Sequence, residues 1–287
     1  MSLSCWIEAT RLRTLPVSIA GVILAIGYAR LHHSFAPAPA LLCLTFAILA
    51  QIASNFANEY YDFRAGLDRP GREGPRRGVT EGDITPRAML MATYLTLAAA
   101  CAVGCSLIYF GGWWLLPVGI AIALGVIAYS AGPYPLSHHG LGEVAVLLFF
   151  GIIPVNLTYY LQCGLWDTSV LLGSISAGLM GANVLIINNY RDADADADVG
   201  KHTLAVILGR PAVRTLYIVN GLVAVILMWN CWTSMGPYAW IAPAAYTAVL
   251  LLIWLLMGRL KGHRLTPLLG ATATAMLAYA TAFLILA

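Results

Sequence analysis

Four aspartates alternate with alanines in residues 192–198, directly after a long apolar run that ends at Ile187. Carboxylates about 5–6 Å apart on a helix repel one another, by roughly 3 kcal/mol per pair at an effective dielectric near 20. The cluster therefore predicts a bound cation, and carboxylate oxygens favour hard cations such as Mg²⁺ or Ca²⁺. An EF-hand loop is excluded, because Ala197 and Thr203 stand where that loop needs glycine and glutamate.

A second copy of this pattern lies 130 residues upstream. Residues 58–62 and 188–192 both read N-x-Y-x-D, and a further aspartate follows six residues later, at Asp68 and Asp198. Each copy stands at the end of an apolar run. Two matched copies at two helix ends predict one shared site, whereas solvated polar helix ends would need no such match.

The elements that carry these motifs belong to a membrane protein. The 287 residues are 60% hydrophobic and only 10% charged, which excludes a soluble domain and indicates several membrane spans. Nine apolar segments are long enough to cross a bilayer, at residues 15–31, 38–61, 88–109, 113–131, 143–162, 168–190, 212–230, 236–257 and 266–286. The expected fold is all-α: one domain over residues 1–287, built as a bundle of nine transmembrane helices around a central cavity. No disulfides are expected, because the six cysteines form no C-x-x-C pattern.

The basic residues predict how the bundle is oriented. Of the 16 lysines and arginines, 15 lie in the N-terminal segment and the even-to-odd connections, and only Arg30 lies on the other side. By the positive-inside rule, the N-terminus is cytoplasmic and the C-terminus is outside, in a multi-pass protein of the inner (cytoplasmic) membrane. The two acidic motifs and the mouth of the cavity are then on the cytoplasmic side.

A polar stripe runs down the second segment from its acidic end. Gln51, Asn55, Asn58 and Asp62 are spaced four, three and four residues apart. This spacing places them on one helix face over about three turns, on the order of 16 Å. Polar groups in membrane helices face the bundle interior. The stripe favours a cavity that descends from the cytoplasmic interface, with a purely structural network between helices as the alternative.

The connection over residues 63–85 is long and carries five arginines. Long loops in compact bundles are commonly lids or binding loops, and arginine fits phosphate oxygens bidentately. Arg72, Arg76 and Arg77 are therefore candidate phosphate ligands, although a loop that is merely positive inside remains open for each. Lys201, just after the second acidic motif, could neutralise the acids or bind a phosphate.

The connection after the fourth segment is rich in glycine, proline and tyrosine. His138 and His139 are interpreted as plain loop histidines, because neighbours in a regular element point apart. Glu143 begins the fifth segment, where a helix N-terminus stabilises a carboxylate, and it is a weak site candidate. Tyr129 and Tyr134 are candidate walls of a substrate site, with ordinary packing as the alternative.

Acids with Mg²⁺, arginines and an apolar interior together suit a polyprenyl diphosphate. Mg²⁺ completes its octahedron with phosphate oxygens and can stabilise the departing diphosphate. The allylic cation that remains needs a dry pocket and an electron-rich acceptor. The rival class is a transporter that couples to cations through intramembrane acids, but such sites usually lie at the midplane of the bilayer and not at one interface.

The motifs also resemble a known family. The paired acidic motifs are similar to those of the UbiA superfamily of intramembrane aromatic prenyltransferases. Within it, the chain resembles the 1,4-dihydroxy-2-naphthoate polyprenyltransferases of menaquinone biosynthesis. The motifs that carry this are T-L-P at 14–16, S-N-x-A-N-E-Y at 54–60, G-P-x-R-G at 74–78, G-P-Y-P at 132–135, H-G-L-G-E at 139–143 and N-N-Y-R-D at 188–192.

The resemblance implies a Mg²⁺-dependent transfer of a polyprenyl group from its diphosphate to 1,4-dihydroxy-2-naphthoate, with loss of diphosphate and CO₂, giving demethylmenaquinone. The implied metal ligands are Asn58, Asp62, Asn188, Asp192 and Asp196. The candidate catalytic residues are Asp62, Asp192, Asp196 and Lys201. The candidate substrate-binding residues are Asn55, Asn58, Asp68, Arg72, Arg76, Arg77, Tyr129, Tyr134, Asn188 and Arg191.

Two points of the resemblance stay open. Gly66 stands where the superfamily has the third acid of the first motif. If any residue takes the place of that acid, it is Asp68. Another aromatic acceptor, such as 4-hydroxybenzoate, is the alternative to the naphthoate. The expected partners are the two substrates and the lipid bilayer, and no nucleic acid.

Overall fold

The computed structural model describes residues 3–68 and 76–287. Over these residues the secondary structure is helical, apart from one isolated β-bridge between His139 and His202. Six helical stretches of this part are long and apolar enough to cross a membrane: α3 (Pro37–Arg64), α4 (Pro86–Gly111), α6 to α7 (Gly142–Cys163), α8 (Thr168–Asp198), α10 (Arg210–Ser234) and η3 with α12 (Gly262–Leu286). Three apolar helices are shorter: α2 (Leu15–Leu31), α5 (Leu115–Ala128) and α11 (Ile241–Met257).

A helix lies at each of the nine segments predicted to span, and the short helices α1 (Leu3–Ala9) and α9 (Leu204–Leu208) are additional. The apolar segment predicted at residues 168–190 lies in α8, and this helix continues through the acidic motif to Asp198. Alanine, the strongest helix former, alternates with the aspartates there, and cations offset their charge. The second acidic motif is therefore helical throughout.

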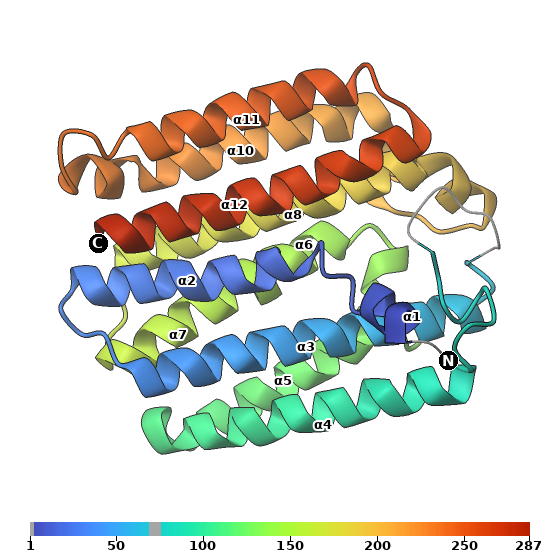
Figure 1. Cartoon of the computed structure of the whole chain (residues 1–287), viewed down its shortest axis with the longest axis horizontal. Coiled ribbons are helices and arrows are strands. Elements are labelled where there is room, and N and C mark those ends of the chain that lie inside the picture. Colours follow the sequence, from blue (N-terminus) through green and yellow to red (C-terminus); the bar gives the residue numbers. More distant parts are fainter. Residues whose placement is uncertain (1–2, 69–75) are drawn as a thin grey trace.

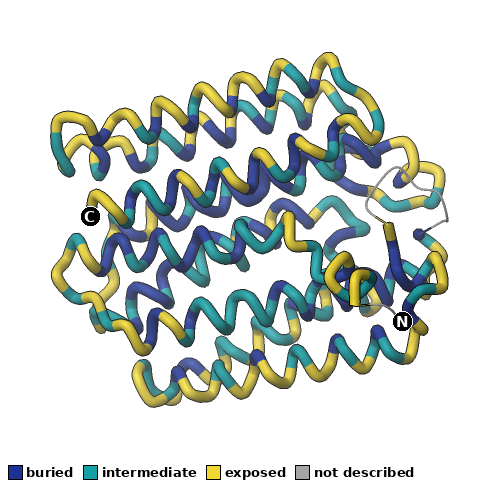
Figure 2. Tube along the Cα trace, in the orientation of Figure 1, coloured by how far each residue is buried: buried dark blue, intermediate teal, exposed yellow. Residues whose placement is uncertain are grey.

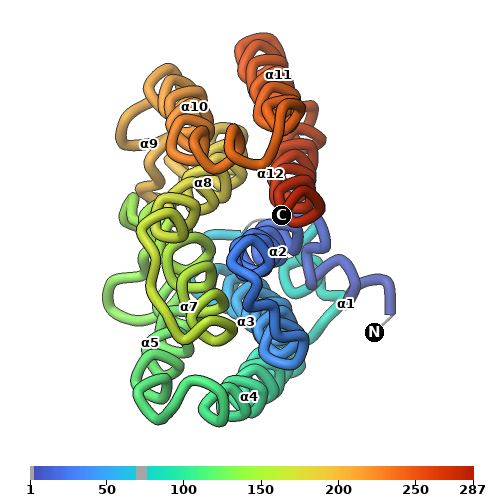
Figure 3. The backbone as a smooth tube through the Cα atoms, turned by 90° about the vertical axis from the view of Figure 1, so that its left-hand side faces the viewer, coloured from blue at the N-terminus to red at the C-terminus, as the bar shows by residue number. Residues whose placement is uncertain are grey.

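The long helices run side by side with their axes roughly aligned (Figure 1). Viewed from the side in Figure 3, α10 and α11 form one flank, α4 and α5 form the other, and α2, α3, α7 and α8 lie between them. Helix α1 and the C-terminal end of α12 lie at opposite ends of the bundle (Figure 1). The acidic ends of α3 and α8 lie at the same end as α1.

Local sequence signals set where two of the long helices begin. Thr85 caps α4 by accepting a hydrogen bond from the Ala88 backbone nitrogen, 3.3 Å away, and Pro86 takes the first helical position. Asp167 caps α8 by accepting from the backbone nitrogens of Ser169 and Val170. The Ser169 hydroxyl also donates to Asp167, and these hydrogen bonds lower the pKa of that carboxyl.

The largest core lies between α2, α8, α10, α11 and α12. Aromatic rings fill it: Trp232 packs edge-on against Tyr279 and Phe283, and Tyr28 packs against Phe283 from the other side. The Trp232 indole N–H donates to the Tyr279 hydroxyl, so the buried polar atoms of this pair are satisfied. Figure 2 shows buried residues on the inward faces and exposed residues on the outer faces. Apolar outer faces suit contact with lipid.

The helix between α5 and α8 contains one wide turn. It begins as α6 (Gly142–Val146), widens into the π-helix η2 (Leu147–Ile152) and continues as α7 (Ile153–Cys163). Pro154 explains the widening, because proline has no N–H to give and crowds the carbonyl four residues before it. Here η2 crosses α8 closely: a Cβ atom on Gly151 would lie 2.5 Å from the Gly178 backbone.

Candidate functional site

A cavity of about 390 Å³ lies between the C-terminal ends of α3 and α8. The connection between α1 and α2, the start of α6 and the segment that follows α8 complete its walls. The site candidates that line it are Asn55, Asn58, Arg76, Arg77, Tyr129, Asn188, Arg191, Asp192, Asp196 and Lys201. Both acidic motifs contribute to this one cavity, the first through Asn58 and the second through Asn188, Asp192 and Asp196, whereas Asp62 and Asp68 are not among its lining residues.

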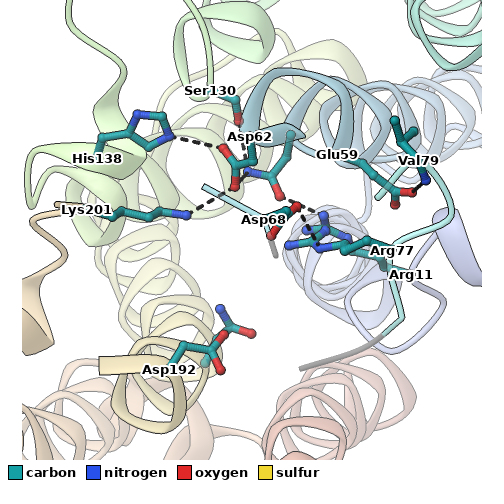
Figure 4. Close-up of polar contacts among 12 residues, drawn as sticks. Arg11, Glu59, Asp62, Asp68, Arg77, Val79, Ser130, His138, Asp192 and Lys201 are labelled. Carbon is teal, nitrogen blue, oxygen red and sulfur yellow. Dashed lines mark hydrogen bonds and ion pairs between the residues drawn. The ribbon is translucent and has the colours of Figure 1, made fainter. Parts of the chain in front are cut away.

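Asp62 is buried at the end of α3, with only 1% of its surface exposed. Three side chains hold its carboxylate: His138 Nε2 lies 3.1 Å from Oδ1, and Lys201 Nζ and Asn58 Nδ2 lie 3.2 Å and 3.1 Å from Oδ2. Figure 4 shows the histidine and the lysine approaching from one side, with Asp192 across the gap. A carboxylate this buried needs such partners, because an unpaired buried charge is costly.

Backbone pairing brings His138 and Lys201 to the same place. The His202 backbone nitrogen donates to the His138 carbonyl over 3.0 Å, which ties the loop before α6 to the segment after α8. Lys201 and His138 therefore reach the same aspartate. The interpretation of His138 as a plain loop histidine is wrong. No local pattern reveals this contact, because it joins residues 76 positions apart.

The second motif carries its own counterion on α8. Arg191 Nε and Nη2 donate to the two oxygens of Asp192 over 2.7 Å and 2.8 Å, a bidentate pair, and Nη2 also donates to Asn188 Oδ1. Asp192 and Asp196 are buried, one helical turn apart. Asp194 points the other way, 85% exposed and paired with Arg210, as the helical spacing predicts.

The loop after α3 adds a further ion pair beside the cavity. Arg77 Nε lies 3.3 Å from Asp68 Oδ2, and both residues are buried (Figure 4). Arg76 is half exposed and pairs with Asp83. Arg72 lies outside the described residues. Glu59, which the sequence did not single out, is buried and accepts from the Val79 backbone nitrogen over 3.1 Å, which anchors the end of this loop to α3.

The polar stripe of α3 both lines the cavity and forms a network. Gln51 Nε2 donates to Asn55 Oδ1, and Asn55 Nδ2 donates to the Thr10 carbonyl. Asn58 Oδ1 accepts from Arg11 over 2.7 Å. The stripe therefore lines a cavity, and its side chains also hydrogen-bond to the connection between α1 and α2. Arg11 is a cavity residue that the sequence counted only as a topology signal.

The two tyrosine candidates separate. Tyr129 lines the cavity. Tyr134 does not: it is 58% exposed, and its ring stacks on His139 at 3.7 Å between centroids. The structure therefore brings only Tyr129 to the site.

A second cavity, of about 140 Å³, continues from the first into the bundle. Its walls are mostly apolar side chains from α2, α3, α4, α5, α6, η2 and α7. It shares Gln51, Ser54, Tyr129 and Phe150 with the polar cavity. An acidic and basic chamber thus adjoins an apolar one, with these four residues at the boundary.

Residues 15–268 match the model of the UbiA prenyltransferase family, which covers most of the chain. The chain belongs to the UbiA prenyltransferase family. It is 36% identical over 286 residues to a 1,4-dihydroxy-2-naphthoate octaprenyltransferase of Mycobacterium leprae, which covers 98% of this chain and 95% of that one. It is 38% identical over 220 residues to the protein of that name in Haemophilus influenzae, covering 72% and 70%.

The fold agrees with this membership of the UbiA family. A UbiA homolog from Archaeoglobus fulgidus, solved with DMAPP and Mg²⁺ bound, superimposes with a TM-score of 0.66 at 16% identity, covering 98% of this chain and 99% of that one. The chain is accordingly a multi-pass membrane protein and a prenyltransferase by family.

Proposed function

We propose that this protein transfers a polyprenyl group from polyprenyl diphosphate to 1,4-dihydroxy-2-naphthoate, with release of diphosphate and CO₂. The observation that carries the proposal is a cavity between the ends of α3 and α8, lined by Asn58, Asp192 and Asp196, that adjoins an apolar cavity. The polar chamber suits a diphosphate and the apolar chamber suits a hydrocarbon chain. Membership of a prenyltransferase family agrees with that pairing, and it disfavours the rival reading as a transporter.

The residues at the two helix ends fit Mg²⁺. Asp62, Asp192 and Asp196 offer buried carboxylates, and Asn58 and Asn188 offer amide oxygens. No cluster of three or more histidine, cysteine or acidic side chains forms a ready metal cage among the described residues. Mg²⁺ does not require one, because it commonly takes one or two carboxylates and completes its shell with substrate phosphates and water. Bound there, the metal would stabilise charge on the departing diphosphate.

The neighbouring cations have a matching role. Lys201 and Arg191 each pair with an acid of the proposed ligand set, and Arg76 and Arg77 line the same cavity. We propose that Lys201 turns from Asp62 to the diphosphate when substrate and metal bind. Arg77, which is held by Asp68, would supply a fixed positive charge beside the diphosphate. Arg76 would supply a positive charge that can move.

The hydrocarbon and the acceptor would meet at the boundary of the two cavities. The isoprenoid chain would extend into the apolar cavity, which keeps water from the allylic cation. The aromatic acceptor would lie near Tyr129, within reach of the amides of Asn55 and Gln51. The choice of naphthoate over 4-hydroxybenzoate rests on the names of the similar bacterial proteins.

The whole chain would serve as one domain of nine membrane-spanning helices. We propose that the cavity opens to the cytoplasm, with the N-terminus cytoplasmic and the C-terminus outside, because the basic residues gather in the connections on the side of the acidic motifs. In a bacterium this places the protein in the inner membrane.

A side-by-side assay tests the function. The purified protein is given Mg²⁺, one polyprenyl diphosphate and equal concentrations of dihydroxynaphthoate or 4-hydroxybenzoate, and diphosphate, CO₂ and prenylated product are measured. We expect turnover with the naphthoate and release of one CO₂ per product. Prenylation of the benzoate alone would reject the acceptor and keep the enzyme class. No diphosphate release with either acceptor would reject the proposal.

A further inference from the structure

Glu143 is a buried acid of the polar cavity that the proposed diphosphate chemistry does not use. It lies in the first turn of α6, lines the cavity and is 8% exposed. Its Oε1 atom accepts a hydrogen bond from Asn189 Nδ2 over 2.9 Å. Its Oε2 atom is buried and has no hydrogen-bond partner among the described residues.

This acid differs from three other buried acids around the cavity. Asp62, Asp68 and Asp192 each pair with a lysine or an arginine. Among the described residues no ion pair includes Glu143. A buried carboxyl oxygen without a partner is costly, and such groups concentrate where a ligand or a reaction uses them.

A purely structural role does not account for both oxygens. Linking α6 to Asn189 requires one acceptor atom, which a glutamine would supply equally well without a buried acid. The second oxygen is what a carboxylate adds. It can accept a hydrogen bond, and then a proton, from a bound molecule.

The position of Glu143 suits an aromatic ligand. A Cβ atom on the adjacent Gly142 would lie 3.6 Å from the Tyr129 hydroxyl, so Tyr129 and the start of α6 are close neighbours. Tyr129 also stands at the boundary of the polar and apolar cavities. A flat ring bound beside it would present an edge to Glu143 and a carbon to the end of the isoprenoid chain.

We propose that Glu143 is the general base that removes the proton from the ring hydroxyl of the aromatic acceptor. The inference rests on the proposed prenyl transfer and adds the residue that activates the acceptor. A hydroxyl ortho to the reacting carbon donates a hydrogen bond to Oε2. This contact satisfies the open oxygen and orients the ring.

The proton transfer can be followed through the reaction. The ring O–H bond breaks, the proton passes to Glu143, and the electron pair left on oxygen raises the electron density of the ortho carbon. That carbon bonds to the allylic carbon, whose C–O bond breaks with its electron pair leaving on diphosphate. Loss of CO₂ from the attacked carbon returns an electron pair to the ring, and the oxygen recovers its proton from Glu143.

The test compares Glu143→Gln and Glu143→Asp with the wild type. The glutamine keeps the acceptor for Asn189 and removes the base, so kcat should fall about 100-fold or more, in the range for loss of a general base. The aspartate keeps a carboxylate and should retain at least ten times the kcat of the glutamine variant. Binding of the prenyl diphosphate with Mg²⁺, measured by calorimetry, should match the wild type in both. Glu81→Gln, an exposed acid, is the matched control.

A second readout separates a base from a structural residue. With a ring-fluorinated acceptor, whose hydroxyl is more acidic, the ratio of wild-type to Glu143→Gln turnover should shrink, because the proton leaves more easily without help. The proposal would be overturned if this ratio of turnover rates were the same for the fluorinated and the unfluorinated acceptor. It would also be overturned if the Asp and Gln variants had equal turnover. The comparison between the two acceptors remains valid even if the Gln variant binds substrate poorly. A wild type that turns over no acceptor would instead refute the proposed function.

Discussion

Lys201 Nζ lies 3.2 Å from Asp62 Oδ2, although 139 residues separate them in the sequence. This contact joins the lysine that follows the second acidic motif to the aspartate of the first. The segment after the second motif is thus linked to the end of the first motif. A lysine at this position competes with a metal ion for Asp62 and can also bind a phosphate group of the substrate.

Replacing Lys201 should separate these two roles. In Lys201→Met, Mg²⁺ alone should bind more tightly than in the wild type, because no ammonium competes for Asp62. The affinity for prenyl diphosphate should fall about tenfold, equivalent to roughly 1.4 kcal/mol. Calorimetry with Mg²⁺ and with prenyl diphosphate measures both, and Lys201→Arg is the control that keeps the charge. Unchanged Mg²⁺ affinity in the Met variant would argue against competition at Asp62.

Loss of either central aspartate should stop turnover. Asp62→Ala and Asp192→Ala each remove a carboxylate of the proposed metal–diphosphate set, and diphosphate release should fall about 100-fold or more. Asp194→Ala is the matched control, because Asp194 is exposed and its pair with Arg210 contributes at most about 1 kcal/mol. Near-normal activity of either central variant would contradict the assignment.

The loop arginines should affect the prenyl substrate more than the acceptor. Replacing Arg76 and Arg77 together by glutamine should raise the KM for prenyl diphosphate about tenfold and change the KM for the acceptor less. Arg87→Gln, an exposed arginine at the start of α4, is the control. Equal changes in both constants would indicate a general disturbance of the site.

The crossing of η2 and α8 should tolerate no side chain at Gly151. A Cβ atom there would lie 2.4 Å from the Ser174 carbonyl oxygen and 2.5 Å from the Gly178 backbone, which is too close without moving a helix. Gly151→Ala should therefore destabilise the protein by about 1–3 kcal/mol. Gly270→Ala, with no heavy atom within 4 Å, should be neutral or stabilising. Thermal unfolding in detergent compares the two, and equal midpoints would refute the close crossing.

The topology can be tested without purifying the protein. A reporter active only in the cytoplasm should be silent when it is fused after Ala287 and active when it is fused to the N-terminus. The basis is the concentration of lysine and arginine in connections on one side. Activity of the C-terminal fusion would contradict the nine-span arrangement.

The sequence by itself determined the helices and the identity of the acidic motifs. Apolar runs of sufficient length locate membrane helices, and helical spacing separates the buried Asp192 and Asp196 from the exposed Asp194. These are local properties, because a span depends on consecutive residues and a helix face depends on spacings of three and four. Hydropathy is local in the same way, so the apolar segment stops near residue 190 while the helix continues through the charged motif to Asp198.

Only the tertiary structure decided which groups meet. His138 and Arg11 looked like ordinary loop residues, yet they contact Asp62 and Asn58. Tyr134 looked equivalent to Tyr129 and lies outside the cavity. These outcomes depend on how helices and loops far apart in the chain pack together, and no spacing within one segment encodes such distances. The Glu143 oxygen that has no hydrogen-bond partner among the described residues is a further example, because only the packed structure shows which groups surround it.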